Sequence, residues 1–533
     1  MTSISSARAH LGFSGTLARR RLMSFAIVVG VLLLWQLAAV TVFAHRFVLP
    51  SPVSVWTTMV DDNFYAADVG STLSIAWKGW LLGNGAALVL AGICLVFPVA
   101  EGGLMTLGVA TYCVPTIAVG PLLVVLYGDD GAKIVMSALS VFFVTLVAAV
   151  TGLRAASPTT LEAVHAFGGG RWAQLFKVRL RASIPTLASG LTIAAPAAIL
   201  GTMIGDYLGG QTGLGVIMLQ AQQQLAVSRT WGIAVVSTAV CGLAFALTAA
   251  LARRVGADVD APLDAGMTRT RADRGRLAAA AIAAAKLVGA VASGLLAWEV
   301  LIKTSGLGPY FVKSPADVWR YLFTSAGSAA NRHTLLTNLG QTARDAGSGW
   351  VAGTAAAILV AFALILLPSV GAAVMPFVIV LRSVPLIAMC PLLGLVFGRG
   401  LTGVTIIAGL VTFVPSLVTI AGGLRTAPSA ATDVVYCCGG GTVSTLLKVR
   451  VPFALPEFFA AAKISMPGAV LGSVLAEWLI TAHGIGYAMA YDIISSNYND
   501  LFASIAALLA ISLGLYAIVG TIESLVRERI RGS

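Results

Sequence analysis

Residues 152–185 read GLRAASPTTLEAVHAFGGGRWAQLFKVRLRASIP, and residues 423–456 read GLRTAPSAATDVVYCCGGGTVSTLLKVRVPFALP. Both stretches contain Gly-Leu-Arg, Gly-Gly-Gly, Lys-Val-Arg and a final Pro in the same order, at one constant offset of 271 residues. Chance does not hold one register over so many glycines, prolines and charged positions. The chain therefore contains an internal duplication, with two copies of one unit.

The duplication extends well beyond these two stretches. The further matches are Pro98, Pro115, Pro121 and Gly128 with Pro368, Pro385, Pro391 and Gly398; Asp206, Gly213 and Gly215 with Glu477, Gly484 and Gly486; and Ser51-Pro52 with Ser314-Pro315. The offset changes only slightly along the chain, so both halves follow one design.

The composition places both halves in a membrane. Of 533 residues, 58% are apolar and 11% are charged, with a mean hydropathy of +0.91, whereas soluble domains carry roughly 25% charged residues. These values exclude a cytosolic enzyme, a disordered chain and a secreted disulfide scaffold. Because one helical span needs about 20 apolar residues, twelve spans would use about 240 residues and leave room for loops.

Hydropathy predicts an all-α membrane protein of about twelve transmembrane helices, six in each half. The predicted spans are 24–44, 72–98, 103–126, 134–152, 186–208, 230–251, 279–303, 345–368, 372–397, 402–424, 457–481 and 502–524. Six is an even number, so both copies enter the membrane from the same side, as parallel repeats related by an axis along the membrane normal.

The repeat also divides the chain into domains. The predicted divisions are an N-terminal cytosolic tail at 1–23, a first repeat at 24–252 with its core at 70–252, a cytosolic linker at 253–278, a second repeat at 279–525 with its core at 335–525, and a cytosolic tail at 526–533. The apolar run from Met23 to Ala44 is longer than the 7–15 residues of a signal-peptide core, so we interpret it as a retained span.

The basic residues orient this arrangement. Segments predicted to lie inside carry 21 Lys and Arg, against 7 in segments predicted to lie outside, which places both termini in the cytosol. The net charge of +12 comes from short segments between apolar runs, a pattern that argues against a nucleic-acid partner. The six cysteines lack zinc-ligand spacing, so we predict no metal site and reduced thiols.

The repeated stretch between the fourth and fifth spans of each half reads as a short helix, a glycine turn and a second, basic helix. Leu161, Val164, His165 and Gly168 fall on one helical face. Gly168 is expected to end the first helix with a positive φ, which glycine adopts without strain. The acid Glu162 suits the start of a helix.

The spacing of an acid, Ala or Val, four residues, Gly, an aliphatic residue and a closing Pro resembles the EAA loop of bacterial ABC importer permeases. The matching positions are Glu162, Ala163, Gly168, Val178 and Pro185 in the first copy, and Asp433, Val434, Gly439, Val449 and Pro456 in the second. A Ser-Pro-x-x-Val-Trp segment, a Pro-rich third span and an acid followed by Gly-Leu-Gly resemble the nitrate/taurine/sulfonate branch of that family. The resemblance covers nearly the whole chain, twice.

This resemblance implies a type I ABC importer permease fold and a transport subunit without enzymatic activity of its own. It further implies two ATPase subunits that bind ATP and Mg²⁺ and dock on the two loops, an extracytoplasmic substrate-binding protein, and a place in the lipid of the bacterial cell membrane. The solute would be small, with sulfonate, nitrate and vitamin precursors as candidates. The chain itself has no GxxxxGK motif followed by Ser or Thr, so it carries no P-loop for ATP.

The sequence departs from the family's loop pattern at two positions, and it allows alternative roles for the loop residues and alternative functions for the chain. The second loop has Asp433 where the family usually has Glu, and the first has Arg181 where the second has Pro452. Helix capping is the alternative role for Glu162 and Asp433, and an ordinary turn for Gly168 and Gly439. A twelve-span secondary transporter is the alternative function, and a membrane scaffold or channel subunit is a third class.

Three ionisable residues are candidates for the solute pathway or its gate. Arg382 is predicted inside the ninth span, where it would attract an anion or pair with a neighbouring helix. Asp206 and Glu477 are predicted near the outer ends of their spans, where they would line a gate or simply lie at the membrane interface.

Overall fold

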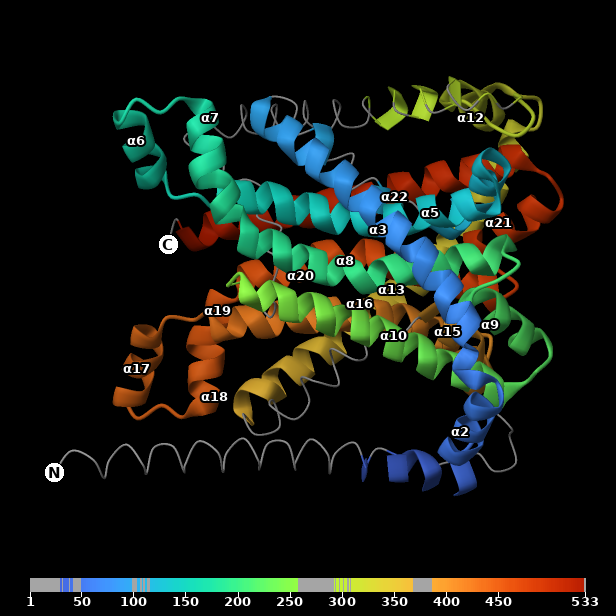
Figure 1. Ribbon diagram of the computed structural model, residues 1–533, viewed down its shortest axis with the longest axis horizontal. Helices are drawn as coiled ribbons and strands as arrows, with labels where there is room; N and C mark the ends of the chain where they lie inside the picture. The colour runs from blue at the N-terminus through green and yellow to red at the C-terminus, as the bar shows by residue number, and fades with distance from the viewer. Residues whose placement is uncertain are drawn as a thin grey trace.

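The computed structural model of this chain describes residues 49–97, 116–256, 308–367 and 386–531, together with short pieces between 29 and 41, 103 and 112, and 292 and 306. Within these residues the regular secondary structure is helical throughout, in agreement with the predicted all-α fold (Figure 1). The predicted tail at 1–23 and all but the first four residues of the predicted linker at 253–278 lie outside the described residues.

The helices of the first half run in the order that the repeat predicts. They are α2 (Pro52–Asp61), η1 (Asn63–Tyr65), α3 (Ala66–Val96), α5 (Thr116–Arg154), α6 (Pro158–Ala166), α7 (Arg171–Gln174), η2 (Leu175–Arg179), α8 (Leu180–Gly209), α9 (Leu214–Gln223) and α10 (Val227–Arg254).

The second half repeats this order with matching elements. They are α12 (Pro315–Trp319), η3 (Arg320–Thr324), α13 (Ser328–Leu366), α15 (Leu386–Phe397), α16 (Leu401–Arg425), α17 (Ser429–Cys437), α18 (Thr442–Thr445), η4 (Leu446–Arg450), α19 (Val451–Phe453), α20 (Leu455–Leu479), α21 (Gly484–Ile494) and α22 (Tyr498–Arg531). Even the π-helical segments η2 and η4 recur at the same place.

Among the described residues, eight helices are long and apolar enough to cross a membrane. They are Asn63–Val96, Leu126–Arg154, Arg171–Gly209, Val227–Arg254, Ser328–Leu366, Leu401–Arg425, Leu455–Leu479 and Tyr498–Glu523. Each matches one of the predicted spans. The four other predicted spans, at 24–44, 103–126, 279–303 and 372–397, include residues outside the described ranges.

Several of these helices extend beyond the predicted spans. α13 begins at Ser328, well before the predicted boundary at residue 345, because its first turns carry polar residues that hydropathy does not recognise. The fourth span likewise begins earlier than predicted, just before Gly128, which interrupts α5 with a φ of 69°. Gly398, its counterpart, has a φ of 87° between α15 and α16.

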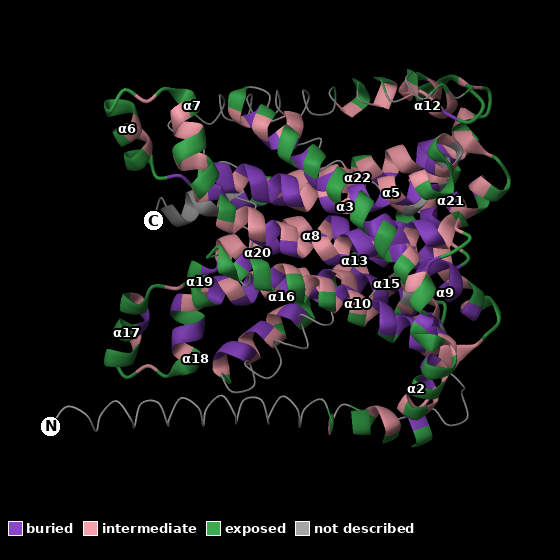
Figure 2. Ribbon diagram, viewed as in Figure 1, coloured by how far each residue is buried: buried purple, intermediate pink, exposed green. Residues whose placement is uncertain are grey.

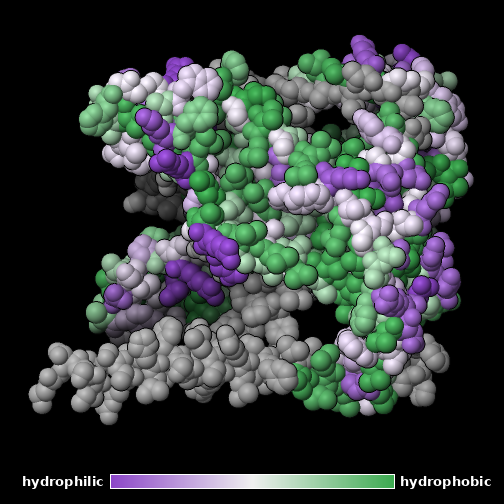
Figure 3. Space-filling view, viewed as in Figure 1, coloured by the Kyte–Doolittle hydropathy of each residue, from purple (hydrophilic) through white to green (hydrophobic). Residues whose placement is uncertain are grey.

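The two halves pack in the same way. In the first, α5 packs against α8 and α3; in the second, α16 packs against α20 and α13. The halves also meet, since α15 contacts α9 and α10 while α21 contacts α5. Hydrophobic side chains cover much of the surface between the two ends of the bundle (Figure 3), as expected of helices that face lipid.

Glycines allow the closest of these helix contacts. On α3, a Cβ added to Gly83 would lie 2.5 Å from the carbonyl oxygen of Ala138 on α5. On α13, a Cβ added to Gly353 would lie 2.4 Å from the carbonyl oxygen of Gly409 on α16. Each belongs to a G-x-x-x-G pattern, with Gly79 and Gly349 one turn earlier, a spacing that lets helix backbones approach closely in membranes.

We expect Gly83→Ala to lower the stability of the detergent-purified protein by about 1–3 kcal/mol, because the new methyl group must push α3 and α5 apart. Gly85→Ala is the matched control on the same helix, since nothing lies within 4 Å of its added Cβ. The control should be neutral or stabilising. Thermal unfolding of both variants checks this, and equal midpoints would contradict the proposed close packing.

Candidate functional site

Two helical hairpins, α6–α7 and α17–α18, project from the same end of the molecule (Figure 1). They are the two stretches that resemble EAA loops, and their residues are mostly exposed (Figure 2). α9 and α21 lie at the opposite end of the bundle. A protein that approached from the hairpin end could therefore contact both hairpins at once.

A glycine turn sets the shape of each hairpin. Gly168 has a φ of +81° and Gly439 a φ of +79°, which confirms the predicted left-handed glycine. The next residue in each copy donates its N–H back into the first helix at 2.8 Å, Gly169 to Val164 and Gly440 to Val435. A side chain with a β-carbon at Gly168 or Gly439 would strain this conformation.

The two loop acids lie on the exposed surface of the hairpins. Glu162 and Ala163 on α6 are exposed, and so are Asp433 and Val434 on α17. The helices begin at Pro158 and Ser429, so both acids lie in the second helical turn, and the first turns contain no acid. The capping role considered for Glu162 and Asp433 is therefore wrong. Neither carboxylate forms an ion pair within the described residues.

One exposed residue of the hairpin was missed by the sequence analysis. Phe167, directly before the glycine turn, is 93% exposed, which is unusual for a phenylalanine. Its counterpart in the second half is Cys438, which is also exposed. The sequence contained a signal for this residue, because an aromatic residue at a polar surface turn often marks a site of protein–protein contact.

Each hairpin is fixed to the bundle by an arginine of the π-helical segment. Arg179 donates from Nη1 to the carbonyl oxygen of Leu153 at 3.2 Å, and Arg450 donates to that of Leu424 at 3.1 Å. These acceptors belong to the last turns of α5 and α16. Arg179 is half-buried, and its guanidinium satisfies a carbonyl group at a helix end. Each arginine thereby bonds its hairpin segment to a helix that is long and apolar enough to cross a membrane.

The aliphatic and proline positions of the motif lie behind the hairpins. Val449 is 7% exposed and Val178 is half-buried. Pro185 lies within the continuous helix α8, whereas Pro456 stands in the first turn of α20, after a break at Ala454. The break falls between Pro452 and Pro456, since each proline removes one helical hydrogen bond and only the second half has both.

At the other end of the molecule, Asp206 on α8 is 1% exposed and joins three helices. Its Oδ2 accepts the hydroxyl of Thr72 on α3 at 3.1 Å and the N–H of Gly215 on α9 at 3.4 Å. Lys133 on α5 places its Nζ 2.9 Å from Asp206 Oδ1. We refer to Asp206, Thr72 and Gly215 as the first acid clamp.

The second half contains the same arrangement, the second acid clamp. Glu477 on α20, 0% exposed, accepts at Oε2 from the hydroxyl of Thr342 at 2.8 Å and from the N–H of Gly486 at 2.9 Å. The position of Lys133 is taken by Val404, which is 1% exposed. The two clamps therefore share the hydrogen bonds from a threonine and a glycine but differ in charge, because Glu477 has no lysine beside it and instead forms a side-chain hydrogen bond with the buried acid Asp345.

The paired glycines after each acid are explained by this packing. A Cβ on Gly213 would lie 2.4 Å from Asp206 Oδ2, and one on Gly484 would lie 2.2 Å from Glu477 Cδ. Both glycines also have positive φ, +126° and +88°. The acid and the Gly-x-Gly pattern are thus parts of one buried contact.

The clamps place three charged residues in the protein interior. Lys133, which precedes the predicted span 134–152 and is one of the seven cations in segments predicted to lie outside, lies within α5 and is 2% exposed. Asp206 and Glu477 are also fully buried within the bundle. A role at a gate and a plain position at the membrane interface both stay predictions. Arg382, the third candidate, lies outside the described residues, and among the described residues no cluster of His, Cys, Asp or Glu could hold a metal ion.

Comparison with known families gives two matches along this chain. A family model described as "Binding-protein-dependent transport system inner membrane component" matches residues 81–257 and again residues 353–532. Each match covers one half of the duplication, from the helices α3 or α13 to the end of α10 or α22. No solved structure matches the chain significantly.

Curated relatives match one half at a time. A probable ABC transporter permease protein of Haemophilus influenzae is 30% identical over 222 residues, 42% of this chain and 88% of that protein. The riboflavin transport system permease protein RibX of Chloroflexus aurantiacus is 30% identical over 156 residues, 29% of this chain and 58% of that protein. The putative aliphatic sulfonates transport permease protein SsuC of Bacillus subtilis is 26% identical over 198 residues, 36% of this chain and 71% of that protein.

Proposed function

This chain belongs to the family of binding-protein-dependent transport system inner membrane components, and on that premise we propose that its two hairpins couple it to two separate ATPase subunits. The chain is an ABC importer permease in which two permease units are fused, and it is a multi-pass protein of the plasma membrane. The family assigns it partners that bind the solute and hydrolyse ATP. The number of ATPase subunits and their contacts are our proposal.

The observation that carries the proposal is the position of the hairpins. Two copies of one helix–glycine–helix unit project at the same end of the bundle, with matching positive φ at Gly168 and Gly439. Two equivalent docking units at one end fit two copies of one soluble partner. The rival secondary transporter has no use for such a pair, since it takes its energy from ions that cross the bilayer.

The contacts of each docking unit follow from its exposed side chains. Glu162 and Asp433 offer carboxylates without ion-pair partners in the described residues, suited to basic side chains on the ATPase. Phe167 offers an exposed apolar anchor, of the aromatic kind that dominates interface energetics. Cys438 replaces it in the second half, so we expect the first hairpin to bind its ATPase more tightly.

The proposed cycle uses the ties between hairpins and spans. When the ATPase subunits close on ATP and Mg²⁺, they move both hairpins, and Arg179 and Arg450 transmit that motion to α5 and α16. The two halves then tilt about the pseudo-twofold axis and open the path alternately to each side. In this scheme both termini and both hairpins face the cytosol.

The solute is proposed only as a class. The relatives are named for riboflavin and for aliphatic sulfonates, a heteroaromatic vitamin and small anions. We propose a small organic solute, with anions among the candidates, delivered by an extracytoplasmic binding protein. Arg382 remains the residue we would test first for attraction of an anion.

Purification of the tagged full chain from its own cells tests the coupling proposal. We expect an ABC ATPase to copurify at two copies per chain and to lose its association when Glu162→Lys and Asp433→Lys are combined, because charge reversal repels a basic partner. Asp129→Lys combined with Asp130→Lys, at exposed acids of α5 outside both hairpins, serves as the control. Solute uptake that persists without ATP and follows an ion gradient would contradict the proposal.

A further inference from the structure

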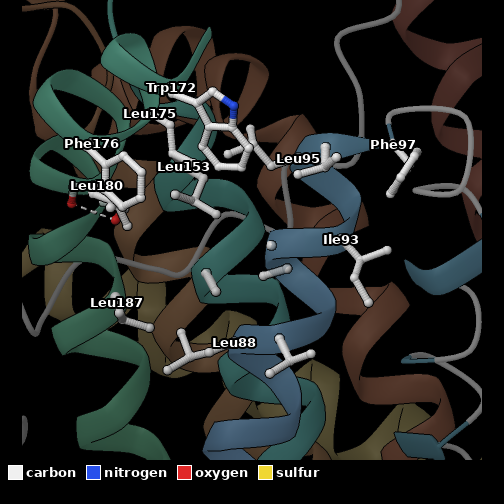
Figure 4. Close-up of a pocket in the computed structure, with 16 residues that line it drawn as sticks. Leu88, Ile93, Leu95, Phe97, Leu153, Trp172, Leu175, Phe176, Leu180 and Leu187 are labelled. Atoms are coloured by element: carbon white, nitrogen blue, oxygen red, sulfur yellow. Dashed lines mark hydrogen bonds between the residues drawn. The ribbon is translucent and has the colours of Figure 1, made fainter.

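A hydrophobic groove lies in the first half, beside the hairpin α6–α7 (Figure 4). It is a cavity of about 600 Å³ between α3, the end of α5 and the helix formed by α7, η2 and α8. Figure 4 shows α3 forming one wall and the helix from Trp172 to Leu187 forming the other. Its lining includes Leu88, Ile93, Leu153, Trp172, Phe176 and Leu187.

The groove is open on the side of the molecule that faces lipid. On α3, Val89 is 62% exposed and Phe97 is 61% exposed. On the opposite wall, Trp172 and Phe176 are both largely exposed, and their rings stack with centroids 6.1 Å apart. Aromatic residues at the end of a membrane helix are typical of the level of lipid headgroups.

The second half has a larger side chain at the position that lies beside the groove in the first half. The repeat pairs Gly92 with Phe362. A Cβ added to Gly92 would meet nothing within 4 Å, whereas Phe362 packs against the buried cluster of α13, α16 and α20. The first half therefore has open space at Gly92, where the second half has the side chain of Phe362.

Basic residues directly neighbour three lining residues of the groove, Trp172, Phe176 and Leu180, along the same helical segment. Arg171, Lys177 and Arg181 are exposed, and none forms an ion pair with another described residue. The second half has Thr442, Lys448 and Pro452 at these positions. Hydrophilic side chains over α7 border the hydrophobic surface over the end of α3 in Figure 3.

We propose that this groove binds an anionic glycerophospholipid, with one acyl chain between α3 and α8 and the phosphate at Lys177 and Arg181. The apolar walls accept an alkyl chain, and cations near the inner surface attract anionic headgroups. A soluble anion has no tail for the groove, and a neutral lipid has no charge for the cations. The inference is independent of the proposed ATPase coupling.

Native mass spectrometry of the full-length chain in detergent tests the assignment, with phosphatidylglycerol or phosphatidylcholine added as the probe. We expect one tightly retained phosphatidylglycerol in the natural sequence, and its loss in Gly92→Phe, which adds to the groove the side chain that the second half has at this position. Lys177→Gln with Arg181→Gln should weaken retention of phosphatidylglycerol by about five-fold or more for each cation removed, since each is worth about 1 kcal/mol near an anionic surface.

Lys448→Gln, at the exposed cation of the second half, is the matched control and should leave retention unchanged. Equal retention of phosphatidylglycerol in the natural sequence and in both groove variants would overturn the proposal. Equal retention of phosphatidylcholine and phosphatidylglycerol would overturn the anionic assignment. The cation variants lie on the exposed surface, so their thermal unfolding should match the natural sequence and guard against misfolding as the cause.

Discussion

Asp206→Asn is expected to destabilise this protein by about 3–5 kcal/mol, because it leaves the ammonium of Lys133 buried without a counter-charge. Lys133 is 2% exposed and its Nζ lies 2.9 Å from Asp206 Oδ1. Asparagine keeps an oxygen for Thr72 and Gly215, so the substitution removes the charge and little else. Thermal unfolding of the detergent-purified chain measures the loss.

The duplication supplies the matched control for this prediction. Glu477→Gln makes the same chemical change in the second acid clamp, where Val404 stands in place of the lysine. No buried lysine is left behind there, and the substitution removes a like charge beside the buried Asp345, so we expect a loss of no more than about 1 kcal/mol, the value of an ordinary hydrogen bond. Adding Lys133→Met to Asp206→Asn should recover most of the lost stability. Equal effects of Asp206→Asn and Glu477→Gln would show that the ion pair contributes nothing.

The second large effect concerns transport. Replacing Gly168 and Gly439 together with valine is expected to reduce ATP-driven uptake at least about ten-fold. A β-branched residue at positive φ costs about 1–3 kcal/mol, so each hairpin would relax away from the geometry that the ATPase contacts. The single variants show whether the two hairpins are equivalent.

Two neighbouring glycines provide the control. Gly170 has a φ of −75° and Gly441 a φ of −85°, both extended, and a Cβ at either position would meet nothing within 4 Å. Valine at both should therefore leave uptake close to the natural level. Uptake measured in membrane vesicles with the cognate binding protein decides between the outcomes. Full uptake in the Gly168→Val, Gly439→Val chain would contradict the docking role of the hairpins.

The linear sequence was sufficient to predict the all-α fold, the repeat and the eight spans found among the described residues. Membrane spans are long apolar runs, and the repeat is a register of glycines, prolines and charges, so both can be recognised without any contact being known. The glycine turns of the hairpins were predictable for the same reason, since backbone conformation at Gly168 and Gly439 depends on the residue itself. Hydropathy failed at helix ends such as the start of α13, because it detects the apolar segment and not the hydrogen-bonded helix.

Contacts between residues distant in sequence could be identified only from the tertiary structure. The partnership of Lys133 with Asp206 depends on how α5 and α8 face each other, and no periodicity within either helix indicates it. The open space at Gly92 depends on how three helices pack, which the sequence does not show. The pairing of Gly92 with Phe362, in contrast, can be found by aligning the two halves of the sequence. Local patterns specify helices and turns, because these depend on neighbouring residues, whereas burial and charge pairing depend on the side chains that packing brings together from elsewhere in the chain.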